Sequence, residues 1–164
     1  MIKDGIKTKA WKDILIESEV DIIGFAETNL NWSKLTQENS LWARTSSWFE
    51  ARTVSVAHNT ADRTAPRRQA GGTALVAMNE VSFRMCEHGK DPRQLGRWTW
   101  MRFNGKNGVT TRVVSVYRPC KSTTSMWSAY LQQLRGLTAE GISTCPREQF
   151  RIDLKEEITR WTTA

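Results

Sequence analysis

The stretch Asp21-Ile22-Ile23-Gly24-Phe25-Ala26-Glu27-Thr28 decides how the rest of the chain is interpreted. Its short apolar run is bounded by polar residues, as in a core strand that is covered on both faces. Glu27 follows the run directly, at the edge where open α/β sheets place their chemistry. The stretch therefore predicts a buried strand that ends in a functional carboxylate.

A second apolar run ends in a comparable way later in the chain. Val113-Val114-Ser115-Val116 leads directly into Tyr117-Arg118-Pro119. A phenol and a guanidinium are both able to donate hydrogen bonds to a phosphate oxygen. Two core strands that each end in a phosphate- or metal-competent side chain suggest one shared site. The alternative for Tyr117 is a half-buried tyrosine whose hydroxyl bonds the backbone, and for Glu27 an ordinary surface carboxylate.

The remaining patterns predict helices and strands around these two runs. Helices are expected over residues 6–18, after Ser122-Thr123-Thr124, and from Pro146, where Phe150, Leu154, Ile158 and Trp161 form an apolar stripe. Strands are expected over 53–57 and 73–78, and residues 98–103 and 109–117 form a hairpin whose second strand is central. Residues 41–47 are ambiguous, and residues 58–70 indicate a basic loop. The order favours a layered α/β (α+β) fold.

The charge of the chain favours a polyanionic partner. Lysine and arginine outnumber acidic residues by 24 to 17, which gives a net charge of +7. Nucleic acid is the partner that we expect from this surplus, with a merely solvated basic surface as the alternative. The eight tryptophans are expected mainly in the core, and stacking on nucleic-acid bases is their functional alternative.

The cysteines and histidines do not predict a structural metal. Cys86, Cys120 and Cys145 are widely spaced, and His58 and His88 are the only histidines, so the spacing of a zinc site is missing. The beginning of the chain lacks the apolar segment of a signal peptide, and no apolar run is long enough for a membrane span. We therefore expect an intracellular protein that does not enter a membrane.

Four segments together resemble a known family. They are Asp21 to Thr28, Gly71-Gly72-Thr73-Ala74-Leu75-Val76, Gly96-Arg97-Trp98-Thr99-Trp100, and Val113 to Cys120. The chain resembles the endonuclease/exonuclease/phosphatase superfamily, in the branch of AP-endonuclease-like domains of non-LTR retrotransposons, over about residues 10 to 161. The resemblance implies a four-layer α/β sandwich, a nuclear location as one option, and Mg²⁺-dependent nicking of DNA, with Mn²⁺ as the alternative metal. It makes Glu27 the metal ligand and puts Tyr117 at the scissile phosphate.

The chain also departs from the family pattern. The family's first strand, which ends in Asn, its later Gly-Asp-x-Asn strand and its terminal Ser-Asp-His have no match. Asp153, Glu156 and Glu157 are expected on the polar side of the last helix and do not replace those motifs. We therefore expect residues 1–164 to form one incomplete domain that lacks the first and later strands, with weak metal binding and impaired or absent activity. Another chain is a conceivable source of the missing strands.

Further residues are candidates for contacts with the DNA backbone. They are Asn29, Asn31, Arg63, Arg67, Arg68, Arg97 and Arg118. The alternative for each is an ordinary turn or solvated loop residue. Three other functions stay open: a nucleic-acid-binding remnant without catalysis, the poorly folding product of a decayed reading frame, and a lipid or inositol phosphatase of the same superfamily.

Overall fold

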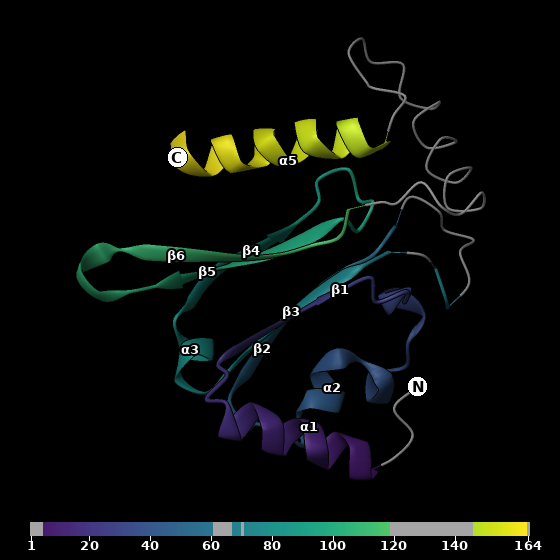
Figure 1. Ribbon diagram of the computed structural model, residues 1–164, viewed down its shortest axis with the longest axis vertical. Helices are drawn as coiled ribbons and strands as arrows, with labels where there is room; N and C mark the ends of the chain where they lie inside the picture. The colour runs from purple at the N-terminus through teal and green to yellow at the C-terminus, as the bar shows by residue number, and fades with distance from the viewer. Residues whose placement is uncertain (1–4, 61–66, 70, 119–145, 164) are drawn as a thin grey trace.

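Two antiparallel sheets lie face to face between layers of helix in the computed structural model, which describes residues 5–60, 67–69, 71–118 and 146–163. One sheet has the order β1 (Ile22–Ala26), β3 (Thr73–Met78), β2 (Arg52–Ala57), and the other β4 (Met85–Lys90), β5 (Trp98–Asn104), β6 (Thr110–Val116). The helices are α1 (Gly5–Glu17), α2 (Leu41–Thr45), α3 (Asn79–Phe83) and α5 (Pro146–Thr163). Figure 1 shows α5 on the outer face of the second sheet and α1 and α2 on that of the first. The fold therefore combines helices with antiparallel sheets, as the α+β prediction requires.

The core is organised around β3, which pairs with β1 on one side and β2 on the other. All six of its residues are buried, so both faces of this strand are covered. Leu75 and Ala77 point between the sheets, where they pack with Met101 of β5. Val76 and its outward-facing neighbours pack instead with Leu15 of α1. Alternation along one strand thus supplies two hydrophobic clusters.

The long helix α5 is attached to the second sheet by aromatic contacts. Trp98 packs edge-on against Phe150 with ring centroids 6.0 Å apart, and Trp100 packs in the same way against Trp161 at 5.5 Å. The predicted apolar stripe is therefore confirmed at these positions. Ile158, however, is 46% exposed and does not face the sheet.

Buried carboxylates of α5 also face the sheet, which corrects the prediction of a polar outer side. Asp153 accepts hydrogen bonds from Arg97 Nη1 at 2.7 Å and from Gln149 Nε2 at 2.7 Å, and it also pairs with Arg93 at 2.8 Å. Glu157 accepts from the indole of Trp100 at 3.3 Å. Gln149 belongs to α5 itself, but the arginines and Trp100 lie on the sheet or beside it and draw the carboxylates inward, because a buried charge needs paired groups.

Both apolar runs that opened the sequence interpretation form edge strands, not central ones. The two faces of β1 are covered as predicted, since Phe25 packs towards α1 and Ile22 towards the other sheet. Among the described residues, however, β1 pairs only with β3, and β6 only with β5. The prediction of a central strand at 113–116 is therefore wrong for this part of the chain. Apolar side chains in a strand indicate that its two faces are covered, but they do not indicate whether both of its edges are paired with other strands.

Several predicted boundaries are confirmed, and the structure adds α2, α3 and β4, which the sequence did not predict. The first helix and the strands at 53–57 and 73–78 agree with the structure within one residue at each end, and the last helix begins at Pro146 as predicted. Residues 41–45 form α2, whose N-cap Ser40 accepts a hydrogen bond from the amide of Ala43. The strand β4 was not predicted, because Cys86-Glu87-His88-Gly89 has little strand character. The helix predicted after Pro119 lies outside the described residues.

Candidate functional site

The loop after β1 holds Glu27 in an unusual backbone conformation. Glu27 and Asn29 have φ angles of 56° and 53°, in the left-handed region that costs energy for residues with a side chain. Two backbone hydrogen bonds fix the loop, from Thr28 N to Gly72 O at 3.1 Å and from Asn29 N to Gly71 O at 2.7 Å. The amide of Gly71 also donates to Asn29 Oδ1 at 3.1 Å. The exposed Glu27 carboxylate thus lies on a turn that is held by backbone hydrogen bonds.

Gly71 and Gly72 connect this loop to the end of β6. Both have φ of 86°, and a Cβ at Gly71 would lie 3.0 Å from the ring of Tyr117. A Cβ at Gly72 would lie 2.6 Å from Thr28 Oγ1. The glycine pair is the turn that opens β3 and not a phosphate cradle at a helix. Because Tyr117 stacks on Gly71, the ends of β1 and β6 come to the same end of the sandwich.

A pocket of about 540 Å³ opens beside the Glu27 loop. Most of its lining is apolar, and it includes Phe25, Trp32 and Trp48. Three arginines also line it: Arg44, Arg67 and Arg68. The pocket therefore combines one carboxylate, three guanidinium groups and aromatic walls.

Polar atoms within the lining residues lack partners. The indole nitrogens of Trp32 and Trp48 and the hydroxyl of Thr28 are buried without a hydrogen bond among the described residues. A buried polar group without a partner costs free energy. These atoms are therefore available to a ligand that carries hydrogen-bonding groups, once it opens the lining enough to reach them.

The structure divides the predicted DNA-contacting residues into two groups. Arg67 and Arg68 are exposed on the pocket wall, and Arg118 is exposed one residue after Tyr117. Asn31 is buried and caps a 3-10 helix (Trp32–Lys34), accepting hydrogen bonds from the amide and hydroxyl of Ser33. Its carbonyl oxygen is therefore engaged in the loop itself. Arg63 lies outside the described residues.

Arg97 does not belong to a nucleic-acid surface, and this corrects the prediction. Its side chain is 1% exposed and makes hydrogen bonds of 2.7 and 2.8 Å to Asp91, in addition to its bond to Asp153. Burial alone would lower the pKa of the Arg97 guanidinium, but the hydrogen bonds and charges of the two carboxylates raise it above its ordinary value. Arg97 is a permanently charged structural residue.

The Glu27 carboxylate is one oxygen donor of the kind that Mg²⁺ takes. Mg²⁺ takes carboxylate oxygens, keeps several waters and accepts substrate phosphate as a further ligand. Among the residues that the structure describes, Glu27 is the only carboxylate that lines the pocket. In the described part of the chain, no three His, Cys, Asp or Glu residues are grouped closely enough to hold a metal. Glu27 would therefore hold the ion only together with water and a phosphate.

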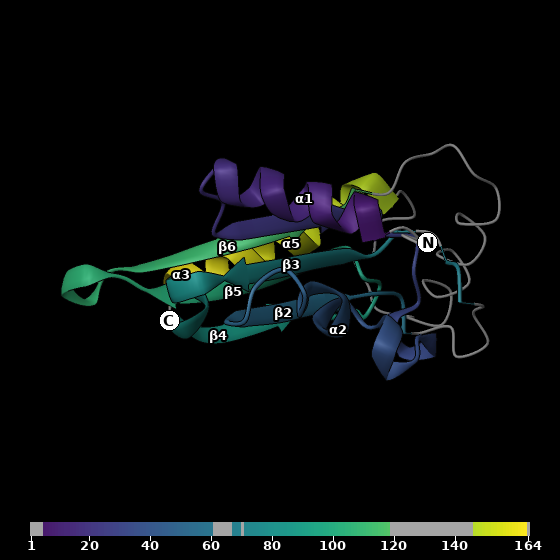
Figure 2. The same ribbon diagram turned by 90° about the horizontal axis from the view of Figure 1, so that it is seen from below.

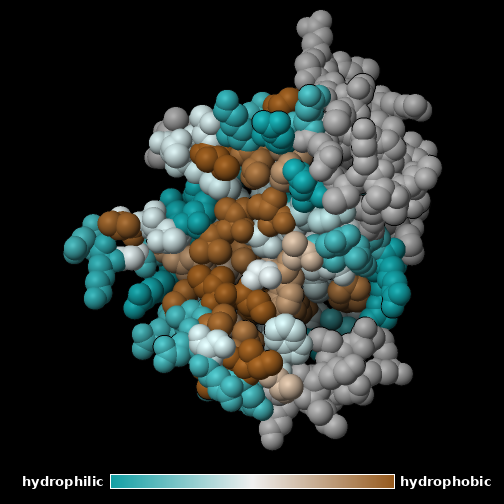
Figure 3. Space-filling model, viewed as in Figure 1, coloured by the Kyte–Doolittle hydropathy of each residue, from teal (hydrophilic) through white to brown (hydrophobic). Residues whose placement is uncertain are grey.

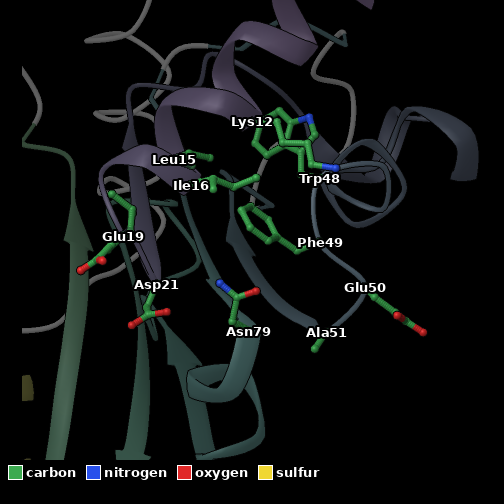
Figure 4. A pocket seen from close by; sticks show the side chains of 11 residues that line it. Lys12, Leu15, Ile16, Glu19, Asp21, Trp48, Phe49, Glu50, Ala51 and Asn79 are labelled. Carbon is green, nitrogen blue, oxygen red and sulfur yellow. The ribbon is translucent and has the colours of Figure 1, made fainter.

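A second hollow lies between α1 and the turn before β2. It has a volume of about 770 Å³, and Figure 4 shows Trp48 and Phe49 facing the helix that carries Lys12. Its other charged residues are acidic, namely Glu19, Asp21 and Glu50. This hollow is therefore a poor candidate for a phosphate site, in contrast to the arginine-lined pocket at Glu27.

Part of the site was not foreseen from the sequence. Arg44, Trp32 and Trp48 are separated from Glu27 by segments without a clear pattern, and only the folded loop brings them together. No helix in the described residues has the length and apolarity needed to cross a membrane. A scan against protein-family models finds no match to the chain, and a search of curated proteins also finds none.

Proposed function

We propose that the chain is a DNA-binding domain of the magnesium-dependent endonuclease type, with the Glu27 loop at its site. The observation that carries this proposal is the convergence of Glu27, the arginine-lined pocket and Tyr117 at one end of a four-layer sandwich. The layered fold and the net charge of +7 support it as well. The domain type would be that of the endonuclease/exonuclease/phosphatase superfamily.

Each group has a defined task in this proposal. Glu27 supplies the carboxylate oxygen for Mg²⁺, which when bound would stabilise negative charge on a phosphodiester. Arg67 and Arg68 pair with neighbouring phosphates, since guanidinium groups match phosphate geometry. The bonds from the amides of Thr28 and Asn29 to Gly72 and Gly71 fix the backbone that carries Glu27.

We expect this chain to bind DNA but to cleave it slowly. Hydrolysis of a phosphodiester requires a base that activates water. Among the described residues, Glu27 is the only acidic side chain on the pocket, and His58 lines a different hollow with Lys90 and Asp91. A second candidate function follows from this arrangement, namely DNA binding without cleavage.

The test compares two exposed glutamates at opposite ends of β1. Glu19 and Glu27 have φ angles of 50° and 56°, so Glu19→Gln is a matched control for Glu27→Gln. Supercoiled plasmid is incubated with each purified protein in Mg²⁺ or in EDTA. Mg²⁺-dependent nicking that is lost only in Glu27→Gln supports the endonuclease proposal. Nicking that is equal in both variants contradicts it.

Salt titration examines the binding function independently of cleavage. Affinity for a DNA duplex is measured against salt for the wild type and for an Arg67→Gln/Arg68→Gln double variant. Each phosphate contact contributes about 0.9 to the slope of log K against log salt. We expect the double variant to lower that slope by about 2. An unchanged slope with unchanged affinity excludes the arginine-lined pocket as the binding surface.

A further inference from the structure

Two strand edges that have no pairing strand among the described residues lie side by side on one side of the sandwich. The free edge of β1 and the free edge of β6 belong to different sheets, but the strands touch across the layers, where Ser115 Oγ donates to the carbonyl of Phe25 at 2.8 Å. Figure 2 shows β6 on the side opposite β4 and β2. An unpaired edge is a template on which a further strand can form.

The register shows which backbone groups β1 offers. Met78 N donates to Asp21 O at 2.8 Å, so Asp21 and every second residue after it direct their backbone groups towards β3. The N–H and C=O groups of Ile22, Gly24 and Ala26 therefore point away from β3. Gly24 and Ala26 are also exposed, so the edge is accessible.

The same reasoning applies to β6. Tyr117 N donates to Arg97 O at 2.6 Å, which sets the alternation along the β5–β6 ladder. The backbone groups of Arg112, Val114 and Val116 consequently point away from β5. Each of the two strands thus offers at least three residues with outward donors and acceptors.

An apolar band covers this side of the molecule. Figure 3 shows it extending from α5 across the two sheets towards α1. The exposed apolar side chains of these elements include Ile14 of α1 at 53%, Val116 of β6 at 36% and Ile158 of α5 at 46%, whereas Ile16 of α1 lines the hollow beside Trp48 and Phe49. Contiguous apolar surface of this kind marks an interaction site.

The two strands run in the same direction, which restricts how a partner can dock. Gly24 in the middle of β1 lies against Ser115, and Gly71, which is bonded to Asn29 after β1, lies against Tyr117 after β6. The beginning and the end of β1 therefore lie beside the beginning and the end of β6. Two molecules that meet through this side can be related by a two-fold axis that runs either parallel to the strands or perpendicular to them.

Charge distinguishes these two arrangements. β1 is flanked by Asp21 and Glu27, which are both acidic, whereas Arg112 lies in the first half of β6 and Arg118 follows its end. Within its own copy Arg112 stacks on Trp100 and has a long ion pair of 3.5 Å with Glu87. An axis across the strands pairs β1 with β1 and β6 with β6, which brings like charges together. An axis along the strands pairs β1 with β6 of the second copy, and opposite charges then meet at both ends. Mixed sheets with parallel neighbours of this kind are common.

We propose that this side is the interface of a closed homodimer in which β1 of each copy pairs, in parallel, with β6 of the other. The β1 and β6 edges of both copies are then used at once, while the β2 and β4 edges on the opposite side stay outside the interface, and two continuous six-stranded sheets cross the interface. Closure by a two-fold axis leaves no edge for a third copy on this side. The inference goes beyond the proposed function and does not depend on it.

Sedimentation equilibrium of the full chain tests the proposal, with Gly24 as the diagnostic position. We expect a species of twice the 18.8 kDa chain mass over a range of micromolar concentrations. Gly24→Pro removes one outward N–H and no bond to β3, so it should give a monomer with unchanged far-UV circular dichroism. Gly24→Ala keeps the N–H, and its Cβ meets Leu75 at an ordinary 3.5 Å, so it should remain a dimer.

A charge variant tests the orientation and does not rely on proline. Asp21→Lys places a lysine beside Arg112 of the second copy, and we expect the dimer dissociation constant to rise at least tenfold. A tighter dimer in Asp21→Lys overturns the pairing of β1 with β6 in favour of β1 with β1. A wild-type monomer at every concentration, or oligomers that grow without limit, overturns the closed dimer itself.

Discussion

Removal of the Asp153 carboxylate tests how α5 is held on the sheet. Asp153 is 4% exposed and has three partners, namely Arg97 at 2.7 Å, Arg93 at 2.8 Å and Gln149 at 2.7 Å. In Asp153→Ala, Arg97 keeps its bonds to Asp91, but one of its two counter-charges is lost inside the protein. Removing one partner of a buried ion pair costs about 3–5 kcal/mol.

This cost is large in comparison with the stability of a domain. Total free energies of unfolding are about 5–15 kcal/mol. With a urea dependence of about 2 kcal/mol/M, the midpoint should fall by about 2 M in Asp153→Ala. Tryptophan fluorescence follows the transition, since Trp98 and Trp100 lie under the helix. Asp153→Asn, which keeps an acceptor oxygen but not the charge, should lie between wild type and alanine.

The control is Glu156→Ala, which removes an exposed carboxylate from the same helix. Surface substitutions of this kind change stability by less than about 0.5 kcal/mol. A loss below about 1 kcal/mol in Asp153→Ala would refute the reasoning. It would mean that water stabilises the charge of Arg97 about as much as the Asp153 carboxylate does.

Two further predictions concern His58 and Gly72. Burial and the charge of Lys90 lower the pKa of His58, so the unfolded chain binds the proton more readily and stability should fall as the pH drops through about 6.5. In His58→Gln, urea midpoints measured between pH 7.5 and 5.5 should show a smaller decrease, and an unchanged decrease would assign it to other groups. Gly72→Ala should cost about 1–3 kcal/mol, because its Cβ would approach Thr28 Oγ1 at 2.6 Å at a φ of 86°. Adding Thr28→Ala should recover part of that loss in thermal unfolding, and no recovery would leave backbone strain as the whole cause.

The sequence predicted well which faces of the strands and helices are buried, because apolar periodicity follows burial directly. The run at 73–78 became the fully buried β3, and Trp98 and Trp100 lie in the core under α5. Strand position was not predictable in the same way. The strands β1 and β6 contain the same residue types as central strands, but backbone pairing leaves no mark in their side chains.

The candidate site was predictable only where it adjoins strand ends. Glu27 and Tyr117 follow apolar runs, and the structure brings both strand ends to Gly71 and Gly72. Arg97 was misassigned because a buried arginine and a surface arginine look alike until Asp91 and Asp153 are located. The burial of Asp153 was missed for the same reason, since its partner lies far away in the sequence.

The buried carboxylates of α5 have a consequence for the uniqueness of the fold. Aromatic and aliphatic contacts tolerate sliding, but Asp153 and Glu157 are spaced by one helical turn and face two different donors, Arg97 and the indole of Trp100. A slip of one turn in either direction would leave one of these donors without its carboxylate. The polar pairs thus specify a single register of the helix on the sheet, even where they add little to the free energy of unfolding.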